Sequence, residues 1–179
     1  SSTPRVKMSH TDDNIDAYIS KKTWDQWHTQ IESKDLQVSI DLSLRDGGPS
    51  IVELSDLKIT SIEKIKSPWQ LSPENLPSFH LISKDAVVNG KPVPNLEADL
   101  ISHDKVMEIS NLVFENVGLS EQNLIFTGSW LDGRTSLRAS ASHQNLSDFL
   151  FKFGVDEPVS GGAFTADVSL FCNCNPWEV

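Results

Sequence analysis

The side chains that most often catalyse reactions or bind metal ions are isolated from one another in this sequence. No two of the five histidines are separated by two or four positions, the spacings that place side chains on one face of a strand or a helix. The motifs of serine hydrolases, zinc proteases, phosphate-binding loops and EF-hand calcium sites are also missing. We therefore predict no catalytic residue, no metal site and no cofactor, and we expect that the protein is not an enzyme. The histidines, which we place at exposed strand or loop positions, are His10, His28, His80, His103 and His143.

The two cysteines, Cys172 and Cys174, lie two positions apart. In an extended strand such residues share a face with their Cα atoms about 6–7 Å apart, which is at the limit of what a disulfide can bridge. Two ligands alone do not complete a zinc site. We predict two small apolar side chains on one strand, bonded neither to each other nor to a metal.

Length and charge limit the classes of function. A chain of 179 residues can form one domain with a hydrophobic core, and no stretch approaches the roughly 18 consecutive apolar residues of a membrane-spanning helix. The N-terminal residues lack the basic and apolar segments of a secretory signal. With a formal net charge of -10 and scattered basic residues, nucleic acid is not an expected partner. The same charge repels anionic headgroups, so any lipid contact is expected through apolar surface.

Alternation of apolar and polar residues is the dominant pattern, and it predicts strands with one apolar face. Asn89-Gly90 and Asp132-Gly133 predict tight hairpin turns between strands. A short amphipathic helix is expected at residues 145–153, capped by Asn145 or Ser142 and ended by Gly154. The expected strands cover residues 36–44, 51–60, 79–88, 96–100, 107–114, 124–130, 135–141 and 164–172.

Residues 1–35 are ambiguous, and we treat them as a segment separate from the β domain of residues 36–179. Asp12, Asp13 and Asp16 could attract a cation, although acidic residues at the start of a short helix explain them more simply. That reading predicts a capped helix near residues 11–19, whereas the alternation at residues 27–31 predicts the first strand.

These elements predict a mainly β fold: an antiparallel, curved, open sheet that is groove-like, with one or two short helices. One short helix covers little of such a sheet. The alternative is a closed sandwich, which needs two inner faces of comparable apolar character.

Residues 51–179 resemble the AsmA-like C-terminal region of the YhdP family, which is related to TamB and to bridge-like lipid-transfer proteins. The order and spacing of four stretches carry the resemblance, because none of them is specific by itself. At the end of the last strand, Cys172 and Cys174 stand where the family commonly has Trp and Gly. The stretches are residues 52–59 (VELSDLKI), 73–81 (PENLPSFHL), 124–130 (LIFTGSW), and 145–150 (NLSDFL) followed by 159–162 (VSGG) and a strand that ends at 176–177 (PW).

The resemblance implies a fragment of a larger envelope protein, anchored in the inner membrane by a helix outside this sequence and projecting into the periplasm. It implies phospholipid, or another acyl-chain ligand, as the partner, together with adjacent segments of the same full-length chain. Membrane contact is expected only through regions outside this fragment.

The apolar strand faces are the candidate site. In one hypothesis they line a groove that binds or conducts phospholipid; in the other they form a closed core of a scaffold domain that binds proteins. Both hypotheses require the same alternation. The five tryptophans (Trp24, Trp27, Trp69, Trp130 and Trp177) either pack at strand ends or contact lipid. The groove candidates are Val38, Ile40, Leu42, Leu57, Ile59, Phe79, Leu81, Leu100, Phe126, Leu137, Val168 and Leu170.

Overall fold

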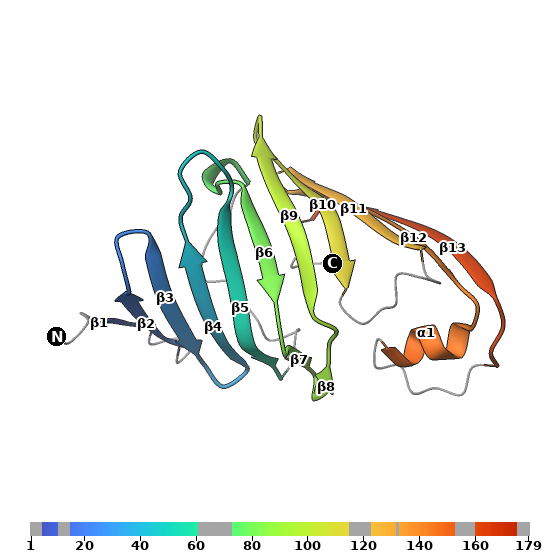
Figure 1. Cartoon of the computed structure of the whole chain (residues 1–179), viewed down its shortest axis with the longest axis horizontal. Helices are drawn as coiled ribbons and strands as arrows, with labels where there is room; N and C mark the ends of the chain where they lie inside the picture. Colours follow the sequence, from blue (N-terminus) through green and yellow to red (C-terminus); the bar gives the residue numbers. More distant parts are fainter. Residues whose placement is uncertain are drawn as a thin grey trace. The chain divides into compact units, whose positions relative to one another are not determined.

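The computed structural model of the chain describes residues 5–10, 15–60, 73–114, 123–131, 133–152 and 160–174 (Figure 1). Its strands belong to one 13-stranded, mixed sheet that does not close on itself. In the described residues they are accompanied by one α-helix, α1 (Leu146–Lys152), and one 3-10 helix, η2 (Pro73–Asn75). The predicted mainly β, open architecture with one or two short helices is confirmed.

The chain divides into two compact units. The first holds Ser1–Pro68 and His80–Asn95, and the second holds Trp69–Phe79 and Leu96–Val179. Residues 15–35, part of the segment with an ambiguous sequence, form strands that pair into the first unit.

The first unit is built on an antiparallel meander in which each strand pairs with the next. β6 (Phe79–Ser83) lies next to β5 in the sheet order, and β7 (Val87–Val88) runs parallel to β5. Asn89 and Gly90, with φ of 51° and 76°, turn β7 into β8 (Lys91–Pro92), as the sequence predicted. The strand expected at residues 79–88 is therefore split in two. The meander consists of β1 (Arg5–His10), β2 (Ile15–Lys21), β3 (Gln26–Glu32), β4 (Leu36–Ser43) and β5 (Ser50–Ile59).

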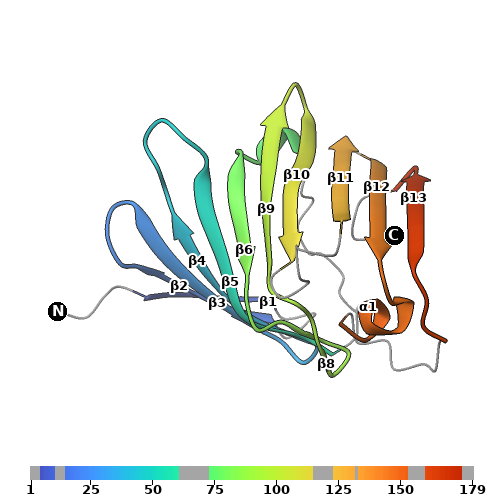
Figure 2. The same cartoon turned by 45° about the vertical axis from the view of Figure 1, so that its right-hand side comes forward.

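The second unit is a five-stranded antiparallel meander with α1 inserted before its last strand. Figure 2 shows α1 at the end of β12, as the sequence predicted. Asn145 caps the helix, because its Oδ1 atom accepts hydrogen bonds from the backbone N–H groups of Ser147 at 3.0 Å and Asp148 at 3.4 Å. The strands are β9 (Leu96–His103), β10 (Val106–Phe114), β11 (Asn123–Leu131), β12 (Arg134–His143) and β13 (Phe164–Cys172).

A β-bulge interrupts one strand in each unit. In β5 the pairing shifts between Gln37 and Ser39 of the partner strand, and Asp56 has a φ of 53°. In β10 it shifts between Ser110 and Val113, and Asn111 has a φ of 50°. The extra residue lets apolar residues three positions apart share a face. In β10 the bulge accounts for the three-residue spacing between Ile109 and Leu112, which interrupts the apolar alternation.

Two expectations are wrong. Residues 15–21 form β2 rather than part of a capped helix, because their apolar side chains pair across strands with those of β3; Asp12 and Asp13 lie outside the described residues. Cys172 and Cys174 are joined by a disulfide. β13 ends at Cys172 and the chain bends at the next residue, so the Cα atoms are 5.2 Å apart instead of the 6–7 Å expected for an extended strand.

Candidate functional site

The first unit carries an apolar face that runs across four strands. Because directly paired residues share a face, Ala17, Ile31 and Val38 form one cross-strand row. These three side chains are buried and form the core cluster of the unit. The parallel row consists of Ile19, Thr29, Ile40 and Leu54.

Most of this face is only half-buried. The half-buried side chains include Ile40, Leu42, Leu54 and Leu57. The residues packed against the core cluster also come from β2 to β5, so the cluster is held by lateral contacts within one sheet. Such a face retains apolar surface that a ligand can cover.

The second unit has an apolar face of the same kind. Leu100 pairs with Ile109, and the row continues through Gly128 and Leu137 to Leu170. A Cβ atom added to Gly128 would lie 2.8 Å from Cδ2 of Leu137, which shows that the leucine tip occupies the space above the glycine. The next row consists of Phe126, Ala139 and Val168.

Helix α1 covers one end of this second face. Phe149 of the helix packs edge-on against Phe164, with the ring centroids 5.1 Å apart, and also lies 5.9 Å from the ring of His143. His143 and Phe164 are a directly paired couple on the apolar side of β12 and β13. Farther along β13, Val168 is 58% exposed and Leu170 is 38% exposed. The face is therefore open at the strand that ends the sheet.

The structure distributes the predicted groove residues over the two units. On the first face, the bulge at Asp56 turns Leu57 and Ile59 to the same side as Leu36 and Leu54. Phe79 and Leu81 lie on β6 and are half-buried. The residues on the first face are Val38, Ile40, Leu42, Leu57 and Ile59; those on the second are Leu100, Phe126, Leu137, Val168 and Leu170.

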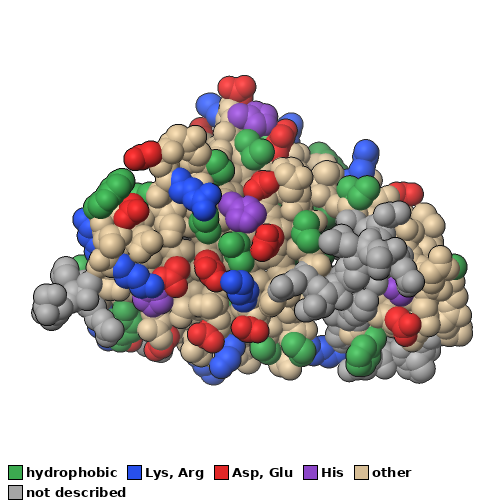
Figure 3. Space-filling model, viewed as in Figure 1, with side chains coloured by type: hydrophobic (Ala, Val, Ile, Leu, Met, Phe, Trp, Pro, Cys, Tyr) green, Lys and Arg blue, Asp and Glu red, His purple; other side chains and the backbone are tan. Residues whose placement is uncertain are grey.

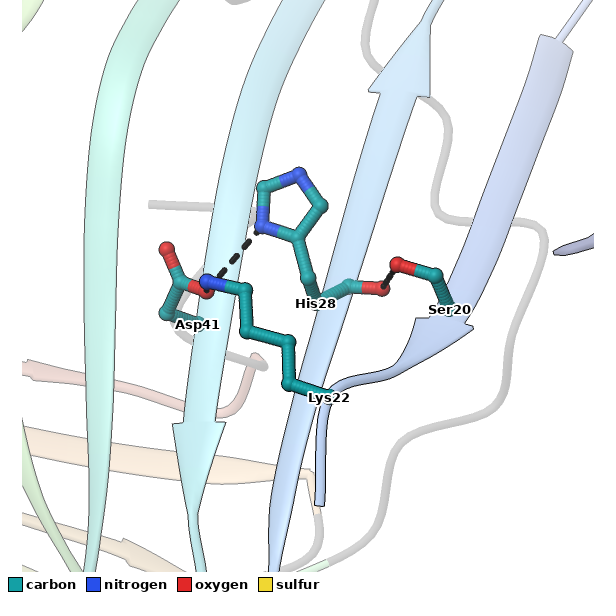
Figure 4. A network of polar contacts seen from close by, with 4 residues as sticks. All are labelled: Ser20, Lys22, His28 and Asp41. Atoms are coloured by element: carbon teal, nitrogen blue, oxygen red, sulfur yellow. Dashed lines mark hydrogen bonds and ion pairs between the residues drawn. The ribbon is translucent and has the colours of Figure 1, made fainter. Parts of the chain in front are cut away.

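The opposite face of the first unit is polar. Figure 3 shows acidic, basic and histidine side chains gathered over these strands on the side turned to the viewer. Asp41 Oδ1 accepts a hydrogen bond from Lys22 Nζ at 2.6 Å and lies 3.0 Å from Nδ1 of His28 (Figure 4). Burial raises the pKa of the Asp41 carboxyl, but hydrogen bonds from Lys22 and His28, with their charges, outweigh it and lower the pKa below its ordinary value.

Ser20, His28 and Asp41 do not form a nucleophilic relay. The hydroxyl of Ser20 donates to the backbone carbonyl of His28 at 3.5 Å, not to its imidazole (Figure 4). A serine nucleophile needs a base that accepts its hydroxyl proton. The cluster is thus a network of cross-strand polar contacts, and sequence reasoning missed it because its members are up to 21 positions apart.

Comparison with known sequences identifies the family. Residues 4–179 match the family described as YhdP protein. The chain belongs to the YhdP family. The match includes β1 to β4, which precede the four stretches that carried the resemblance in the sequence. No curated protein and no solved structure matches the chain.

The second unit of this YhdP-family chain has a depression of about 440 Å³ over β10 to β13. Its lining combines the hydroxyl groups of Ser129 and Ser136, which pair with each other, with the ring of Phe171 and the charged side chains of Glu108 and Arg138.

Two further observations on the YhdP-family chain concern metal ligands and membrane-spanning helices. Within the described ranges, no group of three or more His, Cys, Asp or Glu side chains is placed to hold a metal ion. No helix in that part of the chain has the length and apolar character that crossing a bilayer requires.

Proposed function

We propose that the chain is a segment of an inner-membrane-anchored periplasmic protein that binds or conducts phospholipid between the inner and outer membranes, without catalysing a reaction. Membership of the YhdP family supports the envelope location. The observation that carries the lipid proposal is the pair of apolar faces, one in each unit: the first is largely half-buried, and the second is exposed at β13, beyond the end that α1 covers.

The energetics of such a face suit an acyl chain. Each CH₂ group removed from water contributes about 0.8 kcal/mol, whatever its orientation, so a row of aliphatic side chains binds a chain without a specific polar site. Strands of this length span about 20–30 Å at roughly 3.3 Å per residue, more than the ~15 Å depth of one leaflet of hydrocarbon. The net charge of -10 supports binding through apolar surface rather than through a basic patch.

The second candidate function is the binding of a protein partner that covers the same faces. The exposed apolar side chains of β13, Val168 and Leu170, favour it as well, since an apolar edge strand can also pack against another polypeptide. This candidate makes the chain a scaffold domain of the envelope.

Site-specific photo-crosslinking in cells separates the two candidates. Ile40 and its neighbour Ser39 are adjacent in β4 but point to opposite faces, so a photoreactive residue at each position forms a matched pair. We expect phospholipid adducts from position 40 and none from position 39. Crosslinks from position 40 to protein alone would favour the scaffold function and contradict the lipid proposal.

A further inference from the structure

One end of the apolar face in the first unit carries a cation. Lys21, the last residue of β2, pairs directly with Trp27 of β3, and the row continues through Leu42 to Val52. Lys21 therefore shares a face with the aliphatic rows rather than with the polar network. Its Nζ atom lies 5.3 Å from the centroid of the Trp27 ring, which fixes the ammonium group at the border of the face.

At the opposite end of the same face, β4 and β5 carry aliphatic residues, and His10 of β1 pairs with Ile15. There the strand ends place Ile15, Leu36 and Ile59, with Leu36 and Ile59 directly paired. The face thus changes along the strands from aliphatic to aromatic and cationic. Six residue steps separate positions 15 and 21 of β2, about 20 Å at roughly 3.3 Å per step, which accommodates an extended acyl chain.

Two carboxylates of the adjoining turn and strand, Asp25 and Asp41, have partners other than Lys21. Asp41 binds Lys22 and His28 on the polar face. Asp25 accepts a hydrogen bond from the hydroxyl group of Thr23 within the β2–β3 turn. Trp24 in the same turn is 68% exposed. The backbone N–H of Leu44 donates to the carbonyl of Asp25 at 2.8 Å, which ties the β4–β5 turn to this one. Lysine and tryptophan side chains together suit the boundary between hydrocarbon and headgroup, since each combines apolar and polar parts.

We propose that Lys21 and Trp27 form the site for the phosphate group of the bound lipid, with the acyl chains lying along β2 to β4 toward Leu36 and Ile59. A lysine ammonium binds phosphate as a point charge, whereas the directly paired Leu36 and Ile59 at the far end of β4 and β5 offer a phosphate no side-chain donor. The site rests on the proposed lipid function and deepens it: the ligand is a phosphate-bearing lipid, held in one orientation.

Native mass spectrometry of the purified chain tests this site with phosphatidylglycerol and with diacylglycerol of the same acyl chains. We expect Lys21→Glu to weaken phosphatidylglycerol binding about tenfold or more. Lys21→Met should weaken phosphatidylglycerol binding less and should leave diacylglycerol binding unchanged. Lys58→Met is the matched control, because Lys58 is an exposed lysine that pairs with Gln37 on the polar face. Inorganic phosphate is expected not to displace the lipid, because it lacks the acyl chains.

The outcomes distinguish this site from the function on which it rests. Unchanged phosphatidylglycerol affinity in Lys21→Glu would overturn the site and leave the lipid function standing. Displacement by inorganic phosphate would show a free-phosphate site instead of a headgroup site. If the unsubstituted chain bound neither lipid, both the lipid function and this site would fall.

Discussion

Asp56 and Asn111 occupy equivalent bulge positions in two hairpins that share one register. Every directly paired couple of β9 and β10 has its counterpart in β4 and β5: for example, Leu96 faces Phe114 as Leu36 faces Ile59. The bulged strands also agree in sequence, ELSDLKI at residues 53–59 and EISNLVF at residues 108–114. Each unit thus contains one copy of a bulged hairpin that presents apolar residues at the same positions of one face.

The backbone at these bulges gives the first prediction. Asn111 has a φ of 50°, a conformation that Gly adopts freely and that β-branched residues avoid. Asn111→Val and Asn111→Gly both remove the hydrogen bond that Asn111 Nδ2 donates to Asp99 Oδ2 at 2.7 Å. The difference in stability between these two variants therefore isolates the effect of the backbone conformation. We expect Asn111→Val to be less stable than Asn111→Gly by about 1–2 kcal/mol in urea unfolding. Ser110→Val is the control and should be close to neutral, because a β-branched residue suits an ordinary strand position. Equal stabilities of the Val and Gly variants at 111 would contradict the bulge.

The bulges also mark where sequence analysis reached its limit for the fold. Regular alternation located most strands, and turn residues with positive φ located the hairpins at Gly90 and Gly133, because both signals are local. The strand expected at residues 51–60 is present, but the spacing of Leu54 and Leu57 could not show its bulge, because a bulge is defined by the register with the partner strand. The disulfide was missed for a related reason: the distance between Cys172 and Cys174 depends on a bend that the alternation does not predict.

For the candidate site, the sequence located individual apolar residues but not the rows that they form. Leu100 and Leu137 were predicted separately, and only the register shows that Ile109 and Gly128 connect them. The same holds for Lys21, whose place beside Trp27 depends on the length of the turn between β2 and β3. Whether these rows contact lipid stays a prediction.

The polar network of the first unit predicts a dependence of stability on pH. The pKa of Asp41 is lowered in the folded chain, so the unfolded chain binds more protons as the pH falls below the ordinary value of 3.8. The contribution of Asp41 to the unfolding free energy is therefore fully present above its ordinary pKa of 3.8, and it is lost as the pH falls through the lowered pKa of the folded chain. We expect Asp41→Asn to lower the unfolding free energy by roughly 1 kcal/mol or less at pH 7, with the gap to the unsubstituted chain shrinking below pH 3.8.

Urea unfolding between pH 7 and pH 2.5 measures that gap. Lys22→Met removes one of the two donors to Asp41 and should reduce the pH dependence only in part. Ser20→Ala is the control, since the Ser20 hydroxyl contacts the backbone of His28 and not the carboxylate. A gap that stayed constant over the whole range would show that Asp41 does not contribute through its charge.

The link between Cys172 and Cys174 gives a third prediction. Alkylation of the denatured, non-reduced protein should find no free thiol. Because the closed loop is very short, its entropic contribution is only about 1–2 kcal/mol, and we expect Cys174→Ser to destabilise the second unit by about that amount. The hydrogen bond from the buried Thr135 hydroxyl to the carbonyl of Cys174, at 2.7 Å, holds the same bend and should survive reduction. Labelling of two thiols per chain would disprove the bond.

Val168 and Ser169 provide the last prediction, because they are adjacent in β13, both exposed, and on opposite faces of the sheet. Val168→Asp places a carboxylate in the row of Phe126 and Ala139, where an acyl chain cannot hydrate it. Since Val168 is 58% exposed, the substitution should change the unfolding free energy by less than about 1 kcal/mol.

We therefore expect Val168→Asp to fold normally and to retain much less phospholipid on purification, whereas Ser169→Asp, with the same added charge, retains as much as the unsubstituted chain. Lipid extraction with phosphate quantification, beside urea unfolding of the same samples, measures both quantities. If Val168→Asp unfolded the domain instead, the residue would belong to a closed core, and the scaffold function would take the place of the lipid proposal.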